Sequence, residues 1–512
     1  MSIHITLPRW PWEPIRAVAD RRGVAIWPVG GVVRDMLLGR SLHDWDFAVE
    51  RDAMGMARAV ADALGGAYFP LDEGRDTARV VVRDRRGRRI ELDFAGLRGE
   101  TLLADLRGRD FTINAMAIEP SGALIDPLGG LADLQARLVR AIGPHAFDAD
   151  PLRMLRAVRL TAELEMRLEA KTAAWIIQRA ESLTQASPER IRDEFARILA
   201  TPSPAEHVHM LDELRLLAQV IPEVPPLKEQ PQSPPHRFDV WWHTLLVIDA
   251  VAGVLDLVYG RPPLPRLYAD APESAWDDVK TLLGPFVSPL RRHLSVRLRG
   301  GRKRPTLLVL AALCHDLGKP VTCTEDDQGH LHFYGHEREG ARIAARRLRR
   351  LRFSQPEVKR VATVVRAHLR PGHLARVRGP VTRRAIYRFF RATGSAGVEV
   401  NLLSLADHLA TWGPNLEPDR WTRRLEVVQL LLSHYFERHE ETVAPKPLVG
   451  GRELIESLGI EEGPLVGRLL EAIREAQASG EVHTREEALA LARRLKGKNH
   501  NGAEDAGELL KD

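Results

Sequence analysis

Cysteine is almost absent from this sequence, which has two in 512 residues, Cys314 and Cys323. Two cysteines so far apart exclude the CxxC pairs of a zinc knuckle, and the low cysteine content fits a reducing cytoplasm. Long uncharged stretches are also absent, since no segment of the length needed to cross a bilayer lacks charged residues. The first residues do not show the basic and then apolar pattern of a signal peptide. These absences predict a soluble, cytoplasmic protein that does not enter a membrane.

The composition is that of an ordinary globular protein, with 44% hydrophobic and 28% charged residues. A chain of 512 residues is too long for one compact core, so we expect three or more domains or helical subdomains. The formal net charge is +5, and arginine far outnumbers lysine. A phosphate-rich partner would explain this excess, because guanidinium groups bind phosphates bidentately, and a genome biased toward arginine codons would explain it equally well.

Two parts of the chain differ in their hydrophobic pattern. The N-terminal third alternates strand-like and helix-like segments, which predicts an α/β unit of about 120 residues with a mixed sheet. From about Asp150 onward nearly every segment has helical periodicity, so the remainder is predicted to be all-α. A proline-rich stretch at 222–237 indicates a linker and a boundary near 230, and the segment from about 260 to 305 is expected to be irregular.

Two carboxylates, Asp44 and Asp46, stand two residues apart in the predicted strand DWDFAVE. Residues two apart in a strand point to the same face of a sheet, so both can bind the same metal ions. Phosphoryl transfer at a two-metal site needs one metal to activate the attacking hydroxyl and another to neutralise the leaving pyrophosphate. Asp93, in RRIELDFAG, is either a third carboxylate of this site or a solvated strand end.

Just upstream, Gly30 and Gly31 are predicted to turn the chain from a strand into a helix. Backbone N–H groups at such a helix start can bind a triphosphate, and Arg34 follows one turn later. A pair of aspartates alone is a weak signal, because surface aspartate pairs are common. The glycine pair and the arginine beside it favour a nucleotide site.

Four ordered motifs resemble those of the class II tRNA nucleotidyltransferase and bacterial poly(A) polymerase family. They are VGGVVRDMLLGRSLHDWDFAVE, LRGRDFTINAMA at 106–117, DPLGGLADL and DPLRMLRAVR, and they cover about residues 24–200. The resemblance implies an α+β fold, with a head domain of the polymerase-β type followed by an all-α neck, body and tail. It also implies a template-independent enzyme that extends the 3′ end of tRNA from CTP and ATP, with Mg²⁺ held by Asp44 and Asp46.

The resemblance further implies which residues bind the nucleotide. In the family, nucleotide contacts come from the positions that match five residues of this chain, and two more belong to the same pocket. The five are Gly31, Arg34, Arg109, Arg153 and Arg156, and the two are Asn114 and Arg159.

Base selection without a template requires a protein group that distinguishes C and A from U and G. Cytosine and adenine each place an amino donor beside a ring nitrogen acceptor, which a carboxylate next to a guanidinium complements. Asp150 and Arg153, three residues apart at a helix start, can present that pair. The alternative is a capping aspartate with a helix-surface salt bridge, and the family resemblance favours base selection.

The sequence departs from the family pattern at two places. Ala149 replaces the glutamate that usually precedes Asp150, although the aspartate itself remains. The segment 94–108 is shorter than the flexible loop of members that add complete CCA, and it resembles that of members that add A or part of CCA. The sequence therefore predicts extension of the tRNA end by CCA, by the terminal A or by part of CCA.

Histidines and aspartates recur in apolar helical stretches of the second half, where each needs a partner. One divalent cation can satisfy four such groups, and two further histidines can bring a second ion, although a buried histidine is otherwise a satisfied core residue. The four are His243, His315, Asp316 and Asp407, and the two are His336 and His368. The pattern resembles the HD phosphohydrolase superfamily, which implies phosphodiesterase or phosphatase activity with a divalent transition metal or Mg²⁺.

These expectations divide the chain into regions. The regions are a nucleotidyltransferase head at 24–147, a helical neck and RNA-binding region at 148–230, an HD domain at 236–440, a tRNA-binding helical tail at 445–496 and a disordered tail at 497–512. Arginine-rich runs at 291–305 and 342–353 suit sequence-independent contacts with tRNA, and a solvated helix face explains the second run as well.

Two other functions are alternatives. A poly(A) polymerase performs the same chemistry on another acceptor, but the arginine-rich C-terminal extension usual in that group is not seen. The other alternative is an HD phosphohydrolase whose nucleotidyltransferase head serves only to bind RNA. Intact Asp44, Asp46 and Arg34 argue against it.

Overall fold

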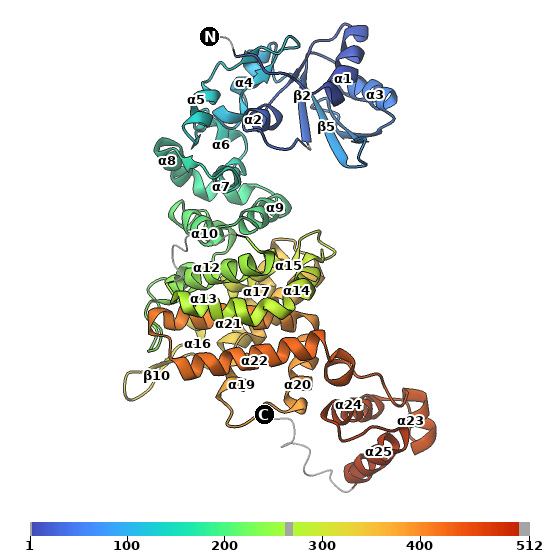
Figure 1. The fold of residues 1–512 in the computed structure, drawn as a ribbon. Helices are drawn as coiled ribbons and strands as arrows, with labels where there is room; N and C mark the ends of the chain where they lie inside the picture. The colour runs from blue at the N-terminus through green and yellow to red at the C-terminus, as the bar shows by residue number, and fades with distance from the viewer. Residues whose placement is uncertain (1–2, 43, 262–269, 501–512) are drawn as a thin grey trace. The chain divides into compact units, whose positions relative to one another are not determined.

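The structure is a computed structural model that describes residues 3–42, 44–261 and 270–500 (Figure 1). It contains two compact units, here called the head unit (Met1–Ile198 with Met210–Val220) and the helical unit (Leu199–His209 with Ile221–Asp512). The last segment of the head unit thus ends at Val220, before the predicted boundary near 230. The reason is that a short helix at Leu217–Val220 packs against the 3₁₀ turn at Ala180–Gln185 and stays with the head unit.

A five-stranded mixed sheet lies at the centre of the head unit, as predicted. Its strand order is β1-β2-β5-β4-β3, with β2 and β5 parallel and the other neighbours antiparallel. Figure 1 shows β2 and β5 next to each other, with α1 and α3 beside the sheet. The bounds are α1 Arg9–Arg22, β1 Ile26–Pro28, β2 Asp44–Val49, α3 Ala53–Leu64, β3 Ala67–Asp72, β4 Thr77–Arg83 and β5 Arg89–Gly96.

Alternation along β2 separates a core face of the sheet from a polar face. Trp45 and Phe47 are buried in the core that α1 and α3 cover. The ring of Phe47 stacks on that of Phe94 in β5, with the ring centroids 5.1 Å apart. Burying one such side chain stabilises the fold by roughly 1.5–3 kcal/mol, so the aromatic residues fix which face of β2 turns inward. Asp44 and Asp46 consequently lie on the opposite face.

The rest of the head unit is built mainly from short helices that follow the sheet strands. The first of them, α2, begins directly after β1, and the later ones follow β5. Their bounds are α2 Gly31–Leu37, α4 Leu102–Arg107, α5 Gly130–Gln135, α6 His145–Ala149, α7 Arg153–Leu164, α8 Ala170–Arg179, α9 Pro188–Leu199 and α11 Leu217–Val220.

The core of the helical unit is formed by four helices that pack against one another. One of them, α12, is long and apolar enough to cross a membrane, but 89% of its most apolar window is buried inside the protein. Its hydrophobic surface therefore serves as core and not as a membrane-facing surface. The four helices are α12 Val240–Tyr259, α15 Arg304–Cys314, α18 Gln355–Ala367 and α21 Gly397–Trp412.

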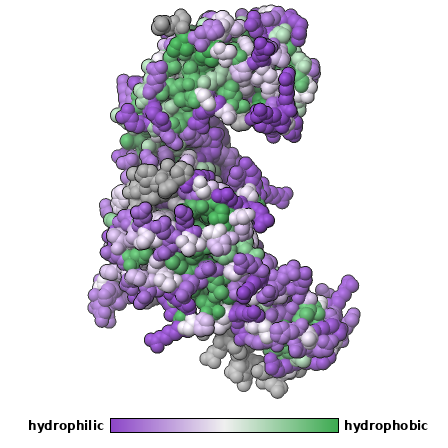
Figure 2. Space-filling view, viewed as in Figure 1, coloured by the Kyte–Doolittle hydropathy of each residue, from purple (hydrophilic) through white to green (hydrophobic). Residues whose placement is uncertain are grey.

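Further helices and a short hairpin follow along the chain, and α10 has its first part in the helical unit and its last residues in the head unit. The last three helices form a small core of their own, and Figure 2 shows mainly hydrophilic residues on the surface that they form. The bounds are α10 Pro204–Glu213, α13 Glu273–Leu283, α14 Val287–Ser295, α16 Lys319–Thr322, β10 Thr324–Glu325, β11 Leu331–His332, α17 His336–Arg350, α19 Arg370–Arg376, α20 Arg383–Thr393, α22 Pro418–Phe436, α23 Gly451–Leu458, α24 Pro464–Ser479 and α25 Arg485–His500.

Two segments are more regular than predicted. The stretch 260–305 contains α13 and α14, and α13 is held to α22 by a hydrogen bond of 3.0 Å from the Trp421 ring nitrogen to Asp278. Residues 262–269 lie outside the described residues. Helix α25 continues to His500, into the segment predicted to be disordered, because a helix can continue by its own backbone hydrogen bonds. The remainder of that segment, 501–512, lies outside the described residues.

Candidate functional site

The polar face of the sheet brings three predicted carboxylates together. Asp46 of β2 lies directly opposite Asp93 of β5 in the parallel register, and Asp44 lies one pleat repeat away on the same strand. Asp44 is exposed, while Asp46 and Asp93 are partly buried. The carboxylate oxygens of Asp44 and Asp46 therefore lie on the polar face of the sheet, next to Asp93 of β5.

Asp93 is engaged in an ion pair. Arg79 of β4 donates two hydrogen bonds to it, from Nε to Oδ1 at 2.7 Å and from Nη2 to Oδ2 at 2.8 Å. The hydrogen bond with Asp93, and the charges of Asp93 and Glu91, outweigh burial and raise the pKa of Arg79. Asp93 also lies inside β5 and not at its end, so the expectation of a solvated strand end is wrong.

Two glycines leave a space beside Asp46. Gly30 has a φ of +73°, in the left-handed region that favours glycine, and α2 begins at Gly31. A Cβ atom at Gly30 would lie 2.7 Å from Nη1 of Arg109 and 3.6 Å from Oδ2 of Asp46. A Cβ atom at Gly31 would lie 3.6 Å from Nη2 of Arg34. Larger residues would thus fill the space that the predicted phosphate-binding groups share.

A buried carboxylate, Asp110, connects several predicted nucleotide-binding residues. Its Oδ2 lies 3.0 Å from Nε of Arg156, and its Oδ1 accepts a hydrogen bond of 3.0 Å from Asn114. Arg34 in turn donates from Nη1 to Oδ1 of Asn114 at 2.7 Å. Burial acts to raise the pKa of Asp110, but Arg156 and the hydrogen bond from Asn114 outweigh it and lower the pKa. Asp110 therefore orients these groups as an ionised acceptor.

Arg109 and Arg153 are positioned by the chain around them. Asp105 accepts hydrogen bonds from Nε and Nη2 of Arg109 at 3.1 and 3.0 Å. Arg153, the first residue of α7, donates from Nη1 to the carbonyl oxygens of Arg109 at 3.1 Å and Ala146 at 3.3 Å. Burial lowers the pKa of Arg153. These contacts tie the start of α7 to the segment that carries Arg109.

The Asp150 carboxylate is held by Arg190, and among the described residues Arg153 reaches Asp150 only through its backbone N–H, which donates to the Asp150 carbonyl oxygen at 3.0 Å. Arg190 of α9 donates from Nη2 to Oδ2 of Asp150 at 2.6 Å and from Nη1 to Oδ1 at 3.3 Å. The N–H of Leu152 also donates to Oδ1 at 3.2 Å. The N-cap of α7 is Leu152, and the ion pair of Asp150 joins it to another helix, so base selection by Asp150 and Arg153 stays a prediction.

Arg159 is engaged with two glutamates. Its guanidinium is buried, with Nε 2.6 Å from Glu194 and Nη1 2.5 Å from Glu163. The structure therefore does not place it among the contacts that link Arg34, Asn114 and Arg156.

The carboxylates of the sheet crowd one another. Burial raises the pKa of Asp46, and Asp93 and Asp44 raise it further, against the lowering effect of Arg109 and Arg156. A divalent cation near these oxygens would favour the ionised form and relieve this repulsion. Carboxylate oxygens are also the ligands that Mg²⁺ prefers. The donor set of Asp44 and Asp46 fits magnesium.

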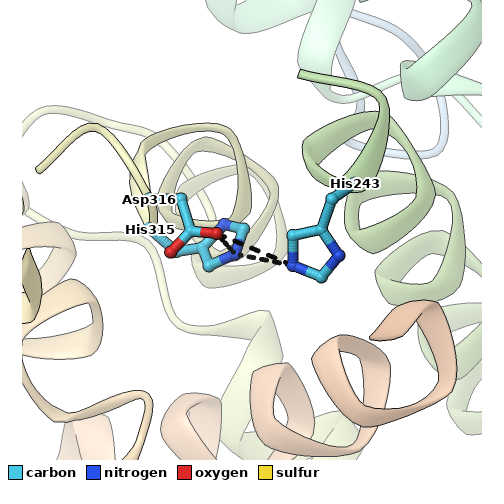
Figure 3. A group of neighbouring side chains, drawn as sticks. All are labelled: His243, His315 and Asp316. Carbon is cyan, nitrogen blue, oxygen red and sulfur yellow. Dashed lines mark hydrogen bonds and ion pairs between the residues drawn. The ribbon is translucent and has the colours of Figure 1, made fainter. Parts of the chain in front are cut away.

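A second group of side chains converges inside the helical unit. His315 and Asp316 follow α15 directly, His243 comes from α12 and Asp407 from α21. Nε2 of His243 lies 3.1 Å from Oδ1 of Asp407 and 3.4 Å from Nε2 of His315. Nε2 of His315 lies 3.1 Å from Oδ2 of Asp316, and Figure 3 shows His243 reaching toward this pair from a separate helix. The structure thus brings all four predicted core residues together.

The two further histidines join the same cluster through Asp316. Ligand atoms of Asp316, His336 and His368 lie within 4.8 Å of one another, as do those of His243, His315 and Asp316. Nε2 of His336 is buried and has no hydrogen-bond partner among the described residues, although Oδ1 of Asp316 lies 3.4 Å from it. A buried nitrogen without a hydrogen bond is costly, and a metal ion would satisfy it.

Three of these histidines are fixed by the same contact. In His315, His336 and His368, Nδ1 lies 2.7 Å from the carbonyl oxygen of the residue three positions earlier. Such a contact places the proton on Nδ1 and leaves Nε2 as the ligand atom. The carbonyls belong to Ala312, Phe333 and Val365.

The charge states of His368 and Asp407 suit metal ligation. Burial, together with the charges of His315 and His336, lowers the pKa of His368 to about 3, so its imidazole is neutral. Burial acts to raise the pKa of Asp407, but the hydrogen bond and charge of His243 outweigh it and lower the pKa. Neutral imidazoles and ionised carboxylates are the forms that bind divalent cations. The mixed nitrogen and oxygen donor set fits a divalent transition metal.

Sequence reasoning missed two neighbours of this cluster. Nζ of the buried Lys319 lies 2.7 Å from Oδ2 of Asp316, and the ring of His236 lies 5.0 Å from that of His243. Burial and the charge of Lys319 together lower the pKa of His236 to about 3. Lys319 stands in the HDLGKP run, so its closeness to the His-Asp pair in sequence could have indicated that it lies near the metal site. His236 lies in the proline-rich stretch, where no sequence pattern indicated a role.

Three family models match parts of the chain. The poly A polymerase head domain matches residues 26–140, and the probable RNA and SrmB-binding site of polymerase A matches residues 165–227. The HD domain matches residues 289–412, which include every predicted metal ligand of the helical unit except His243. His243 reaches the cluster from α12, which lies before that range.

Two bacterial proteins are similar to this chain over nearly its whole length. The A-adding tRNA nucleotidyltransferase of Deinococcus radiodurans is 34% identical over 473 residues, which cover 91% of this chain and 94% of the relative. The CC-adding tRNA nucleotidyltransferase of Thermus thermophilus is 35% identical over 472 residues, which cover 91% and 92%.

Solved structures share the fold at low sequence identity. The apo form of a CCA-adding enzyme has a TM-score of 0.58 at 20% identity, with 93% of this chain and 91% of that chain covered. The Thermotoga maritima CCA-adding enzyme complexed with tRNA has a TM-score of 0.54 at 21% identity, with 94% and 95% covered.

Proposed function

The chain belongs to the class II tRNA nucleotidyltransferase and poly(A) polymerase family, and from this membership we propose how its residues carry out the reaction. It is a tRNA nucleotidyltransferase that transfers nucleotides from CTP or ATP to the tRNA 3′ end and adds CC, A or CCA. The observation that carries the proposal is the position of Asp44 and Asp46 on the polar face of the sheet, beside the glycines at the start of α2.

In this proposal Asp44 and Asp46 hold magnesium, and Asp93 completes the carboxylate set. Magnesium bound there would activate the tRNA 3′-hydroxyl and neutralise the charge of the leaving pyrophosphate. Gly30 and Gly31 keep the space beside Asp46 open for the triphosphate, and backbone N–H groups at the start of α2 bind its oxygens. Because Arg79 holds Asp93, any direct role of Asp93 requires that this ion pair loosens when substrate binds.

The nucleotide is bound by arginines that the Asp110 network orients. Arg34 and Arg156 are fixed through Asn114 and Asp110, and Arg109 lies within reach of the space at Gly30. Guanidinium groups preset in this way bind phosphates without a large loss of side-chain entropy. Asp150 and Arg153 select the base in this proposal, and Arg159 supports the pocket from the buried side of α7.

The length of the addition follows from the segment 94–108. Helix α4 occupies six of these residues. The Thr101 hydroxyl caps its start by accepting a hydrogen bond of 3.2 Å from the N–H of Ala104. Within the helix, Asp105 is held by Arg109. An ordered segment of this kind replaces the flexible loop expected for complete CCA addition. We propose that the enzyme adds CC or A alone.

The test uses tRNA that lacks its last one, two or three nucleotides, with labelled CTP or ATP and Mg²⁺. Addition of CC alone, or of A alone, to the matching acceptor is the expected result. Full CCA addition to the acceptor lacking three nucleotides would contradict partial addition, and no incorporation on any acceptor would contradict the transferase assignment.

A second function is supported by the histidine cluster of the helical unit. With a divalent transition metal or Mg²⁺ held by His243, His315, Asp316 and Asp407, and a second ion near His336 and His368, the cluster would hydrolyse phosphodiesters or phosphomonoesters. Release of p-nitrophenol from bis(p-nitrophenyl) phosphate and p-nitrophenyl phosphate in the presence of Mn²⁺, Ni²⁺ or Mg²⁺ measures this activity. No release with any of these metals would contradict it.

The remaining assignments follow from the same premise. The head is assigned to 24–147, the neck to 148–230, the HD domain to 236–440 and the tRNA-binding tail to 445–496. Because tRNA, CTP and ATP are its substrates and the chain carries two unpaired cysteines, the enzyme acts in the cytoplasm.

A further inference from the structure

Helices α17 and α18 enclose a groove on the helical unit that the two proposed activities do not use. Its volume is about 600 Å³, and residues of both helices line it. The two helices are antiparallel neighbours joined by a short turn, so the groove is part of one rigid hairpin. Its walls are therefore preformed and do not depend on a mobile loop.

The charged side chains along this groove are all positive. They come from both helices, and no aspartate or glutamate is among the lining residues. A groove of one sign along its whole length attracts a polyanion and repels cations. The charged residues are Arg338, Arg342 and Arg349 of α17, and Lys359 and Arg366 of α18.

Most of these charges are not neutralised within the protein. Arg338 pairs with Glu337 and Arg342 with Glu339, but Arg349, Lys359 and Arg366 form no ion pair or hydrogen bond through their side chains among the described residues. This differs from Arg347 on the same helix, whose guanidinium is held by Glu223 at 2.8 Å. The groove thus carries three unpaired charges from its two helices, while the exposed Arg346 and Arg350 of α17, which lie outside it, also form no side-chain ion pair or hydrogen bond among the described residues.

The floor of the groove is small and apolar. Ala341, Ala345, Ala362 and Val358 lie between the charged side chains, so no large side chain blocks access. From Arg338 to Arg349 the helix rises about 16 Å, which corresponds to roughly five nucleotides of one strand at 3.4 Å each. The groove can therefore contact several consecutive phosphates.

We propose that the groove between α17 and α18 binds the phosphate backbone of tRNA through Arg349, Lys359 and Arg366, independently of sequence. The proposal deepens the proposed function and rests on it for the identity of the RNA. It assigns part of the grip on tRNA to the HD domain, and it includes Lys359 and Arg366 of α18, which the arginine-rich run 342–353 does not contain.

The experiment compares two double variants that each remove two positive charges. The groove variant is Arg349→Ala with Lys359→Ala. The matched control is Arg346→Ala with Arg350→Ala, two exposed arginines of α17 that do not line the groove. The affinity for fluorescent tRNA lacking its CCA end is measured by anisotropy from 50 to 300 mM KCl, and circular dichroism verifies folding.

We expect the groove variant to lose two phosphate contacts. The slope of log affinity against log salt concentration should fall by about 1.4 to 1.8, and the affinity near 0.1 M salt should fall tenfold or more. The control should keep the wild-type slope, with an affinity within about threefold of the wild type, because charges outside the groove act only through the screened long-range field. Equal losses in both variants, or no loss in the groove variant, would overturn the proposal.

Two further measurements separate this proposal from its rivals. Competition by poly-glutamate as effective as competition by unlabelled tRNA would show that the groove binds acidic proteins and would overturn the RNA assignment. Nucleotide incorporation by the wild-type enzyme tests the proposed function separately: an enzyme that binds tRNA with the expected groove dependence but incorporates nothing contradicts transfer, not the groove. If the alanine variant misfolds, Lys359→Glu alone, with Arg350→Glu as its control, gives the same comparison.

Discussion

Asp150 and Arg190 form an ion pair between the start of α7 and the start of α9, with Nη2 2.6 Å from Oδ2. The carboxylate proposed to read the base is thus held by a partner 40 residues along the chain. This contact makes the role of Asp150 testable, because a base-reading carboxylate and a structural anchor respond differently to loss of the arginine.

We predict that Asp150→Ala lowers discrimination against UTP and GTP by about ten- to a hundredfold. The amino group of C or A loses its acceptor, and an unpaired buried donor costs roughly 1–3 kcal/mol, where each 1.4 kcal/mol is a factor of ten. Arg190→Ala should reduce discrimination less, since the carboxylate remains. Steady-state kinetics with the four nucleoside triphosphates on one truncated tRNA measure both variants. If both lower all four rates by one common factor, Asp150 is an anchor and does not select the base.

Removal of either β2 carboxylate should abolish transfer. We expect Asp44→Ala and Asp46→Ala to show no detectable nucleotide incorporation, while tRNA affinity stays within a few-fold of the wild type, because these side chains hold metal and not RNA. Gel assays of incorporation and anisotropy titrations with tRNA give the two quantities. Asp62→Ala, on the exposed side of α3, is a control that also removes one carboxylate from the head unit. Incorporation that survives in either β2 variant would contradict the site.

Loss of the His-Asp pair should separate the two activities. We predict that His315→Ala with Asp316→Ala removes bound transition metal and hydrolysis of p-nitrophenyl esters, because Asp316 is shared by both ligand groups. Extension of tRNA should remain within a few-fold of the wild type, since its carboxylates belong to the head unit. Metal content by mass spectrometry is the readout that does not depend on turnover. A well-folded double variant that keeps its metal, or that loses extension, contradicts this separation.

Glu399 should make the stability of the helical unit sensitive to acid. This glutamate is buried beside His293, with Nε2 3.1 Å from Oε2, and beside Arg360. Burial acts to raise its pKa, but the hydrogen bond and charge of His293 and the charge of Arg360 outweigh it, so the folded-state pKa is lowered. The stabilisation is therefore complete above the unfolded-state pKa of about 4.3 and is lost as pH falls through the lower, folded-state pKa.

The substitution Glu399→Gln tests this linkage. At pH 7 it should destabilise the unit by roughly 3–5 kcal/mol, because it leaves the guanidinium of Arg360 without its carboxylate partner. The difference from the wild type should shrink as pH falls below about 4. Urea unfolding at pH 7, 5 and 3.5 measures the free energies. A difference that stays constant with pH would show that the effect comes from packing and not from charge.

Much of the fold follows from local patterns in the sequence. Alternation in DWDFAVE predicted a strand with Asp44 and Asp46 on one face, and helical periodicity after Asp150 predicted the helical remainder. The apolar surroundings of the histidines predicted their convergence, because polar groups in apolar helices need one another. These patterns depend on neighbouring residues or on whether a side chain is buried, so they can be recognised in a single sequence.

The contacts that the sequence did not reveal are long-range pairings. Nothing near Asp93 indicates that Arg79 will hold it, because the pairing depends on the order of strands β4 and β5 in the sheet. Arg190 likewise reaches Asp150 only through the packing of α9 beside α7. The sequence did not predict helix α13, because a proline-rich segment precedes it and its stability comes from packing against α22.

The alternation in β2 has a consequence for how this protein tolerates insertions and deletions. The same strand supplies Trp45 and Phe47 to the hydrophobic core and Asp44 and Asp46 to the polar face. A register shift of one residue would bury the carboxylates and expose the aromatic rings. Folding and chemistry therefore both depend on the same register of β2 in the sheet. A chain that mispairs β2 loses stability together with its metal ligands, so a stable but inactive misfolded head is an improbable outcome of such a change.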